Sequence, residues 1–452
     1  DVCSSDLCAP GPRAMTTSCN PAAALPAALA AGFLPSVDTQ DSVDEKPVCL
    51  FYDLAAWRAG LRSCDAAFGK GFLHALAIKS NPVLSMVKMA VEEGFGVEAA
   101  SMGEVKIALA AGCPKEKIVL DSPVKTIGEL KFALSNGIHI NCDNASELER
   151  VAKIGSSFPG IVGLRINPCS GSGEIAALSV STPDSKFGFC LQDDASEEEA
   201  VALYRKYPFL NCVHVHVGSG KMGIATLVAG ISRVFTFAER VNKELPGRIR
   251  VLDMGGGLGV NFTGNDPQAT FPEYAARLRA AVPRLFPSHP DCPFDHVVTE
   301  FGQALSAPSG WLASRVEVVK PSGTPSNVVL IHFGADLCVR QTYTTQHRRR
   351  LEVYDGQGAA KTGAEVPHNI AGPLCFQGDM LAKDAMYPPI RADDVVVMRD
   401  AGANTLSIYS RHCSRQAPLV VGYDENYKFT VLKPAETYDQ VVDFWAGGQA
   451  KL

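Results

Sequence analysis

A lysine stands at the end of an apolar run in the stretch HALAIKSNPV, residues 74–83. Lysine is seldom fully buried without a partner, so Lys79 either reaches solvent at a strand end or is held there for amine chemistry. A lysine at such a position, once its pKa is lowered, can form a Schiff base with an aldehyde. Several other apolar runs of this chain also end on residues able to do chemistry, which favours the second interpretation.

Three of these run ends complement the amine of Lys79. The loop DMGGGLGV, residues 253–260, is rich in glycine, so its N–H groups can approach a phosphate closely. Glu300 in TEFGQ could hold a pyridine nitrogen protonated, and the flat ring of His216 in HVHVGSG could stack on a cofactor. A tight turn or a core histidine would explain each signal alone. Together they predict a pyridoxal 5'-phosphate (PLP) site.

Short β-rich runs alternate with helical stretches between residues 75 and 302. This alternation predicts right-handed βαβ units and a parallel sheet. Eight such units favour an α/β fold with a closed (β/α)8 barrel of the TIM type, whose chemistry lies at the C-terminal rim. The predicted strands are residues 75–80, 96–101, 117–122, 139–144, 160–168, 212–219, 250–257 and 296–302.

The 452 residues exceed one compact core and predict two domains. We expect the barrel over residues 46–310, although segment 46–54 could instead add a strand to the second domain. Residues 311–452 are β-rich, with Pro, Gly and Asn turns, and predict a C-terminal mostly-β domain. Residues 1–45 are expected to be a partly disordered extension. Its start lacks the pattern of a secretory leader, and Met15 could be the natural first residue.

The overall composition excludes several classes of function. The net charge of -6 gives no basic footprint for nucleic acid or an anionic membrane, and no run of 18 uncharged apolar residues predicts a membrane span. The fourteen cysteines lack zinc-type CxxC pairs, so we expect reduced thiols and no metal site. The final Ala-Lys-Leu resembles a peroxisomal Ser-Lys-Leu signal, which leaves cytoplasmic and peroxisomal locations open.

The chain resembles the PLP-dependent diaminopimelate and ornithine decarboxylases, which share an alanine-racemase-like barrel and a β domain. The resemblance spans about residues 46 to 445 and rests on six motifs in order: AIKSNP, DSKFG, HVHVGSG, DMGGGLG, TEFGQ and GPLCFQGD. It implies that Lys79 links to the cofactor and that His216 stacks on its ring. It also implies a homodimer in which Cys375 reaches the neighbouring subunit's site and helps to protonate the product.

These motifs and strand ends give the expected site. The cofactor-binding set is Lys79, Glu98, Arg165, His216, Ser219, Gly255, Gly256, Gly257, Glu300, Gly302, Gln303 and Asn404. The substrate-binding set is Arg340, Tyr343, Phe376 and Asp379, where Arg340 could hold a carboxylate and Asp379 an amine.

Four positions depart from the family pattern. Gln303 replaces an arginine, Asn404 replaces a tyrosine that approaches the phosphate, and Glu98 replaces an aspartate. Phe376 stands where the family has an acidic residue for the substrate's distal amine. Because burying an unpaired ammonium would cost several kcal/mol, we expect an amino-acid substrate other than diaminopimelate or ornithine.

Two alternatives to a decarboxylase stay open at this point. A racemase on the same barrel would keep Lys79 but would use a tyrosine base, whereas the GPLCFQGD motif favours decarboxylation. A non-catalytic binding homologue is suggested by the changes at Gln303 and Asn404, but it would have little reason to keep Lys79, His216, Glu300 and Cys375.

Overall fold

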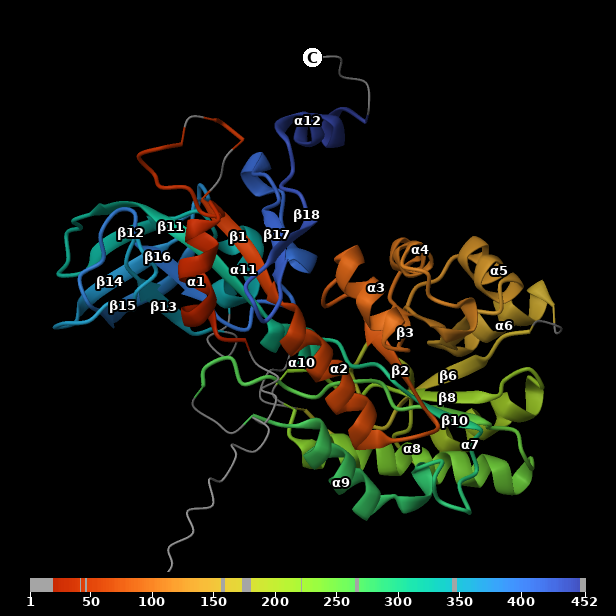
Figure 1. Ribbon diagram of the computed structural model, residues 1–452. Coiled ribbons are helices and arrows are strands. Elements are labelled where there is room, and N and C mark those ends of the chain that lie inside the picture. Colours follow the sequence, from red (N-terminus) through yellow and green to blue (C-terminus); the bar gives the residue numbers. More distant parts are fainter. Residues whose placement is uncertain are drawn as a thin grey trace, which may run out of the picture.

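A computed structural model of the chain contains two nine-stranded sheets, one closed into a barrel and one open (Figure 1). The structure describes residues 19–40, 42–44, 47–155, 159–172, 180–220, 222–264, 268–343 and 348–447, without the side chains of residues 342 and 343. The C-terminal Ala-Lys-Leu and the first eighteen residues lie outside this described part.

The barrel confirms the predicted fold class. Its eight parallel strands are β2 (Phe72–Ala77), β3 (Gly96–Ala99), β4 (Ile118–Asp121), β5 (His139–Cys142), β6 (Val162–Asn167), β8 (Cys212–Val215), β9 (Val251–Asp253) and β10 (His296–Thr299). The barrel closes because β10 pairs with β2. A two-residue strand, β7 (Phe189–Cys190), adds to β6 outside the ring.

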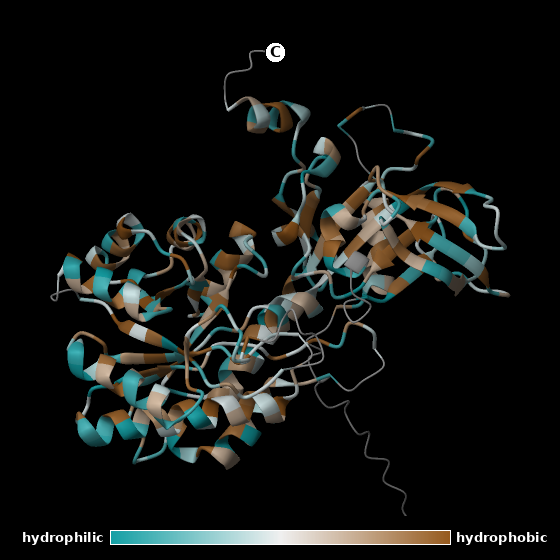
Figure 2. Cartoon of the chain, turned by 180° about the vertical axis from the view of Figure 1, so that it is seen from behind, coloured by the Kyte–Doolittle hydropathy of each residue, from teal (hydrophilic) through white to brown (hydrophobic). Residues whose placement is uncertain are grey.

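Helices surround the barrel and turn their polar faces outward, as the hydropathy colouring of Figure 2 shows. They are α2 (Leu54–Phe68), α3 (Leu84–Glu92), α4 (Met102–Ala110), α5 (Ile127–Ser135), α6 (Ala145–Ile154), α7 (Asp194–Lys206), α8 (Ile224–Glu244), α9 (Phe271–Ala281) and the short α10 (Gln303–Ser306). In α8, Leu227, Ile231, Val234 and Ala238 repeat at helical spacing and are buried. Polar caps fix where helices begin: the Asn144 side chain, for example, accepts from the N–H of Glu147 at the start of α6.

The open sheet forms the core of the second, β-rich part of the chain. Its strands are β1 (Val48–Asp53), β11 (Gly310–Lys320), β12 (Asn327–Ile331), β13 (Leu351–Tyr354), β14 (Val366–Ala371), β15 (Met380–Tyr387), β16 (Val395–Met398), β17 (Leu419–Tyr423) and β18 (Phe429–Lys433). β1 precedes the barrel in sequence but lies between β11 and β17 in this sheet. The chain therefore enters the barrel from the β-rich sheet and returns to it at Gly310.

Three helices of this part were not predicted: α1 (Pro21–Ala30), α11 (Ala335–Tyr343) and α12 (Tyr438–Ala446). In α1, Leu25 and Ala28 are buried in one cluster with Phe51 and Trp311, so this section of the N-terminal extension packs on the sheet. Within the described residues, no helix combines the length and apolarity that crossing a bilayer requires.

Candidate active site

A cavity of about 350 Å³ opens at the C-terminal ends of the barrel strands, around Lys79. The barrel supplies Ala77, Lys79, Ser80, His216, Ser219, Gly220, Gly257, Leu258, Glu300, Phe301, Gly302 and Gln303 to its lining, and the β-rich part supplies Arg340, Asn404 and Ile408. The rim position is the one that a β/α barrel uses for chemistry, because loops from distant strands converge there. Both parts of the chain are needed to enclose the space.

The Lys79 side chain lies two residues beyond β2 and is 46% exposed. Its Nζ lies 2.5 Å from Oε2 of Glu98, which is fully buried on β3. Burial opposes the charge on Lys79, but the carboxylates of Glu98, Glu300 and Asp121 outweigh it and raise the Lys79 pKa. Burial also raises the pKa of Glu98 to about 8. Without cofactor, Lys79 is thus held as an ammonium paired with Glu98, and its pKa is not lowered as amine chemistry would require.

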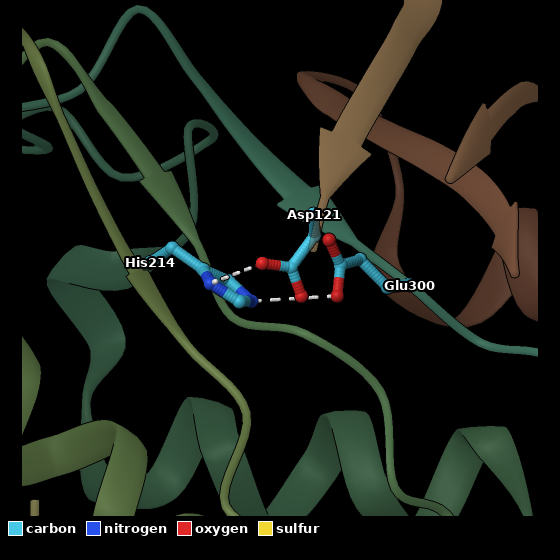
Figure 3. A group of neighbouring side chains, drawn as sticks. All are labelled: Asp121, His214 and Glu300. Carbon is cyan, nitrogen blue, oxygen red and sulfur yellow. Dashed lines mark ion pairs between the residues drawn. The ribbon is translucent and has the colours of Figure 1, made fainter. Parts of the chain in front are cut away.

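A chain of buried charges runs through the barrel interior behind the cavity (Figure 3). Nε2 of His214 lies 3.4 Å from Oε2 of Glu300, and Nδ1 lies 3.7 Å from Oδ1 of Asp121. Oδ2 of Asp121 accepts a hydrogen bond of 3.0 Å from Arg165. Burial favours a neutral His214, but the two flanking carboxylates outweigh it and raise the His214 pKa to about 9.

This arrangement favours an ion-pair network over a metal centre. Ligand-type atoms of Asp121, His214 and Glu300 lie within 4.8 Å of one another, which a cation could in principle use. Asp121 is already paired with the Arg165 guanidinium, and a protonated His214 offers no ring lone pair to a metal.

The ring of His216 is held in one orientation. The Gly256 N–H donates to Nδ1 at 3.3 Å, so Nε2 carries the proton and faces Ser219 Oγ at 3.0 Å. Burial, followed by the charges of Arg165 and Lys79, lowers the pKa of His216 to about 3. A neutral, fixed ring beside the cavity suits stacking on a flat ligand.

The glycine loop lies against the backbone of neighbouring strands. Gly255 and Gly257 have φ of 64° and 102°, a region that favours glycine. A Cβ on Gly256 would collide with the Glu300 carbonyl oxygen, and one on Gly257 would collide with that of Gly218. The N–H groups of Gly257 and Leu258 donate to no group in the described part of the chain. They are free for an anion at the cavity edge.

These features fit PLP. Both carboxylate oxygens of Glu300 are buried and lack a hydrogen-bond partner among the described residues, as a group awaiting a ring nitrogen would. Lys79 would hold the aldehyde end, and the glycine loop and Ser219 lie where a phosphate would meet N–H and hydroxyl donors.

One wall of the cavity carries amide groups and a cationic side chain. Asn404 Nδ2 donates to Gln303 Oε1 at 2.9 Å, and Gln303 Nε2 is buried without a partner among the described residues. Arg340 lines the same space, and Arg349 lies behind it, where it donates to the carbonyl oxygens of Ala403 and Asn404. Arg349 was not among the predicted site residues.

The remaining predicted residues do not reach this cavity within one chain. Arg165 does not line the cavity and donates to Asp121, so its expected contact with the cofactor stays a prediction. Cys375 and Phe376 are exposed on the loop after β14. Asp379 is buried, with Oδ1 accepting from the N–H of Ala335 and Oδ2 from that of Leu374. Its carboxylate therefore shapes this loop, and its predicted contact with a substrate amine is not supported.

One expected residue and two unexpected residues remain to be placed. The side chain of Tyr343 lies outside the described residues, so its expected role stays a prediction. His214 and Asp121 were not predicted as site residues. The alternation HVHV does place His214 on the same strand face as His216, and this signal could have found it.

Comparison with known proteins agrees with this geometry. The family described as "Pyridoxal-dependent decarboxylase, pyridoxal binding domain" matches residues 55–307. Diaminopimelate decarboxylase of Zymomonas mobilis is 31% identical over 363 residues, which cover 79% of this chain and 82% of that protein. The Methanothermobacter thermautotrophicus enzyme of the same name is 27% identical over 81% of this chain and 83% of its own length.

Solved structures share the whole architecture. Helicobacter pylori diaminopimelate decarboxylase complexed with L-lysine aligns with a TM-score of 0.77 at 24% identity, covering 91% of this chain and 98% of that one. Lysine/ornithine decarboxylase of Vibrio vulnificus complexed with cadaverine aligns with a TM-score of 0.69 at 20% identity, covering 85% and 96%. At this identity the structures support the fold.

A barrel with a rim lysine, a glycine cradle and a buried carboxylate, joined to a β-rich domain, defines a PLP enzyme of the alanine-racemase-like fold. Within that class, the chain belongs to the pyridoxal-dependent decarboxylase family. It is accordingly a PLP-dependent amino-acid decarboxylase.

Proposed function

We propose that the enzyme removes the α-carboxylate of an amino acid whose distal end is anionic or uncharged, and that diaminopimelate and ornithine are poor substrates. The observation that carries this proposal is the charge of the cavity wall. Glu300 is the one carboxylate among the described lining residues, and it lies at the base, whereas Arg340 lines the other wall. A distal ammonium would lack an acidic partner, and a distal carboxylate would meet a cation.

Lys79 and Glu98 handle the first proton in this proposal. The surrounding carboxylates raise the Lys79 pKa and keep Nζ protonated, so Nζ must lose a proton before it can bond a carbonyl carbon, and Oε2 of Glu98 lies within hydrogen-bond reach, at 2.5 Å, to receive it. Loss of that proton frees the Nζ lone pair for bonding to a carbonyl carbon.

Glu300 and His216 orient the cofactor, and the cofactor accepts electrons from the substrate. PLP, when bound, withdraws the electron pair that decarboxylation leaves on the α-carbon. Glu300 would face the ring nitrogen of the bound cofactor, and the His216 ring would cover one face of it. The bond from the α-carbon to its carboxylate breaks, CO2 leaves, and a proton must then be delivered to the α-carbon.

A second subunit supplies that proton in our proposal. Cys375 is exposed and does not line the cavity of its own chain, so a partner's copy of this loop would complete the site. Mixing inactive Lys79→Ala and Cys375→Ala proteins should then restore part of the activity, because some mixed dimers carry one intact site. No recovery after verified subunit exchange would contradict shared sites.

Diaminopimelate itself is the second candidate substrate. It is favoured by the relatives, since the Zymomonas mobilis protein of that name is 31% identical. Its distal carboxylate would suit Arg340, but its distal ammonium would face Phe376 or the amides of Gln303 and Asn404.

A CO2-release screen separates the candidates. Purified holoenzyme is offered L- and D-amino acids with acidic, apolar and basic side chains, with diaminopimelate alongside. We expect CO2 and the matching amine from an acidic or apolar amino acid. Turnover of diaminopimelate alone would contradict the proposed specificity. Inversion of the configuration at the α-carbon without CO2 release would indicate a racemase.

A further inference from the structure

No role in cofactor or substrate binding has so far been assigned to His214, a residue of the barrel interior. It is 0% exposed, and among the described residues both ring nitrogens lack a hydrogen bond and face carboxylates instead (Figure 3). It lies in register with Arg165 on β6 and with Asp253 on β9, so the three form one layer of the barrel interior. A histidine kept in such a layer without hydrogen bonds needs an electrostatic reason.

We propose that His214 is a positioning residue that carries a positive charge between Asp121 and Glu300 and thereby keeps Glu300 ionised toward the cofactor's ring nitrogen. The inference rests on the role given to Glu300 in the proposed function. It adds that Glu300 depends on a second buried charge.

The balance of charge in the barrel supports a protonated imidazole. The titratable groups around His214 and its two carboxylate partners are Lys79, Glu98, Asp121, His139, Arg165, His216, Asp253 and Glu300. His139 and His216 are held neutral, since burial lowers the pKa of each to about 3. Burial, followed by the Glu300 charge, raises the Asp253 pKa and favours its neutral form.

Lys79 is paired with Glu98, so Asp121 and Glu300 are the two carboxylates that face His214, and Arg165 neutralises only one of them. A positive charge on His214 supplies the second, and both of its nitrogens already face these carboxylates at 3.4 and 3.7 Å. Burial alone would raise the pKa of Glu300, and the His214 charge reverses this and lowers it.

The charge state of Glu300 decides its use. An ionised carboxylate accepts a hydrogen bond from a protonated ring nitrogen, whereas a neutral carboxyl donates one and favours the unprotonated ring. Without the imidazolium, burial would favour the neutral form of Glu300. His214 thus acts on the cofactor through Glu300 and touches neither cofactor nor substrate.

The direct test is ¹⁵N NMR of holoenzyme labelled at histidine, with His214→Gln used to assign the signal. We expect both His214 nitrogens to stay protonated until the pH approaches about 9. Asp121→Asn should lower the pH at which this signal titrates, and it serves as a second probe if His214→Gln does not fold. A neutral His214 ring at pH 7 would overturn the inference.

The absorbance of bound PLP distinguishes this electrostatic role of His214 from a role in packing the barrel interior alone. In His214→Gln we expect the absorbance of bound PLP to change with pH over a range where the unmodified enzyme is constant. The matched control is His74→Gln, because His74 is also buried in the barrel but bonds Thr299 at 2.8 Å, away from the cavity lining. Identical spectra in all three proteins would also overturn the inference.

The outcomes are distinguishable from failure of the proposed function. CO2 release by an enzyme whose His214 is neutral would refute the inference alone. A charged His214 in a protein that decarboxylates no amino acid would refute the proposed function alone.

Discussion

Phe376 is the single residue whose side chain most changes the expected substrate. It is 45% exposed on the loop after β14, beside Cys375, and an aromatic ring cannot pair with an ammonium by charge. A cation over its ring face would be worth only about 0.5–1 kcal/mol at an exposed site. The loop therefore offers little to a basic distal end.

The variant Phe376→Glu tests this reasoning. A carboxylate here should improve kcat/KM for substrates with a distal amine by roughly tenfold, since a hydrogen bond to a charged group contributes about 1.5–3 kcal/mol. The measurement is kcat/KM with basic and acidic amino acids. Phe376→Gln, which adds polarity without charge, is the control. Equal effects of both variants would show that charge at this position is not what selects the substrate.

At the scale of elements, the glycine loop after β9 contacts the ends of two other barrel strands, β8 and β10. Gly256 packs on the backbone of Glu300 at the end of β10, and its N–H bonds the ring of His216, which follows β8. One short loop therefore fixes the phosphate cradle, the carboxylate and the stacking ring together.

The variant Gly256→Ala should loosen all three. The added Cβ would meet the Glu300 carbonyl, so β10 or the loop must shift, and we expect PLP affinity to fall at least about tenfold, the equivalent of 1.4 kcal/mol. Cofactor titration of the apoprotein measures this. Gly323→Ala is the matched control, because a Cβ added at Gly323 would meet no described atom within 4 Å. Unchanged affinity for Gly256→Ala would mean that the cradle tolerates displacement.

The sequence predicts these elements better than it predicts their contacts. All eight barrel strands follow from local alternation, and Lys79, His216 and Glu300 follow from their strand ends, because strand order fixes which ends meet. The ion pair of Arg165 with Asp121 was not predicted, because a strand end does not specify which side chains meet inside the barrel.

Contacts between distant segments explain the other differences. The kink at Cys338 inside α11 and the backbone bonds of Asp379 arise where separate loops of the β-rich part meet, and no local pattern encodes them. The helix α1 is ordered by burial against Phe51 and Trp311, whereas its own sequence, with Pro26 in its middle, favours helix weakly.

Across the whole molecule, buried neutral histidines make stability depend on pH. Burial lowers the folded-state pKa of His74 to about 4 and those of His139 and His216 to about 3. The unfolded chain binds protons at these residues below about pH 6.5, so the stability they contribute is present above that pH and is lost as the pH falls toward 4.

We expect the urea midpoint of the apoprotein to fall between pH 6.5 and pH 5, and to fall less steeply in His74→Gln. Removal of one histidine that takes up a proton on unfolding lowers the slope of the free energy of unfolding against pH by about 1.4 kcal/mol per pH unit. His412→Gln is the control, because His412 is exposed. A slope unaffected by His74→Gln would contradict a buried neutral histidine at this position.

The central claim is that one covalent attachment at the barrel rim, through Nζ of Lys79, organises the site formed by both parts of the chain. Peptide mapping after borohydride reduction of the holoenzyme tests it most directly. The account predicts a single pyridoxyl-modified peptide, the one that contains Lys79. Modification at another lysine, or none in a protein that has bound the cofactor, would contradict it.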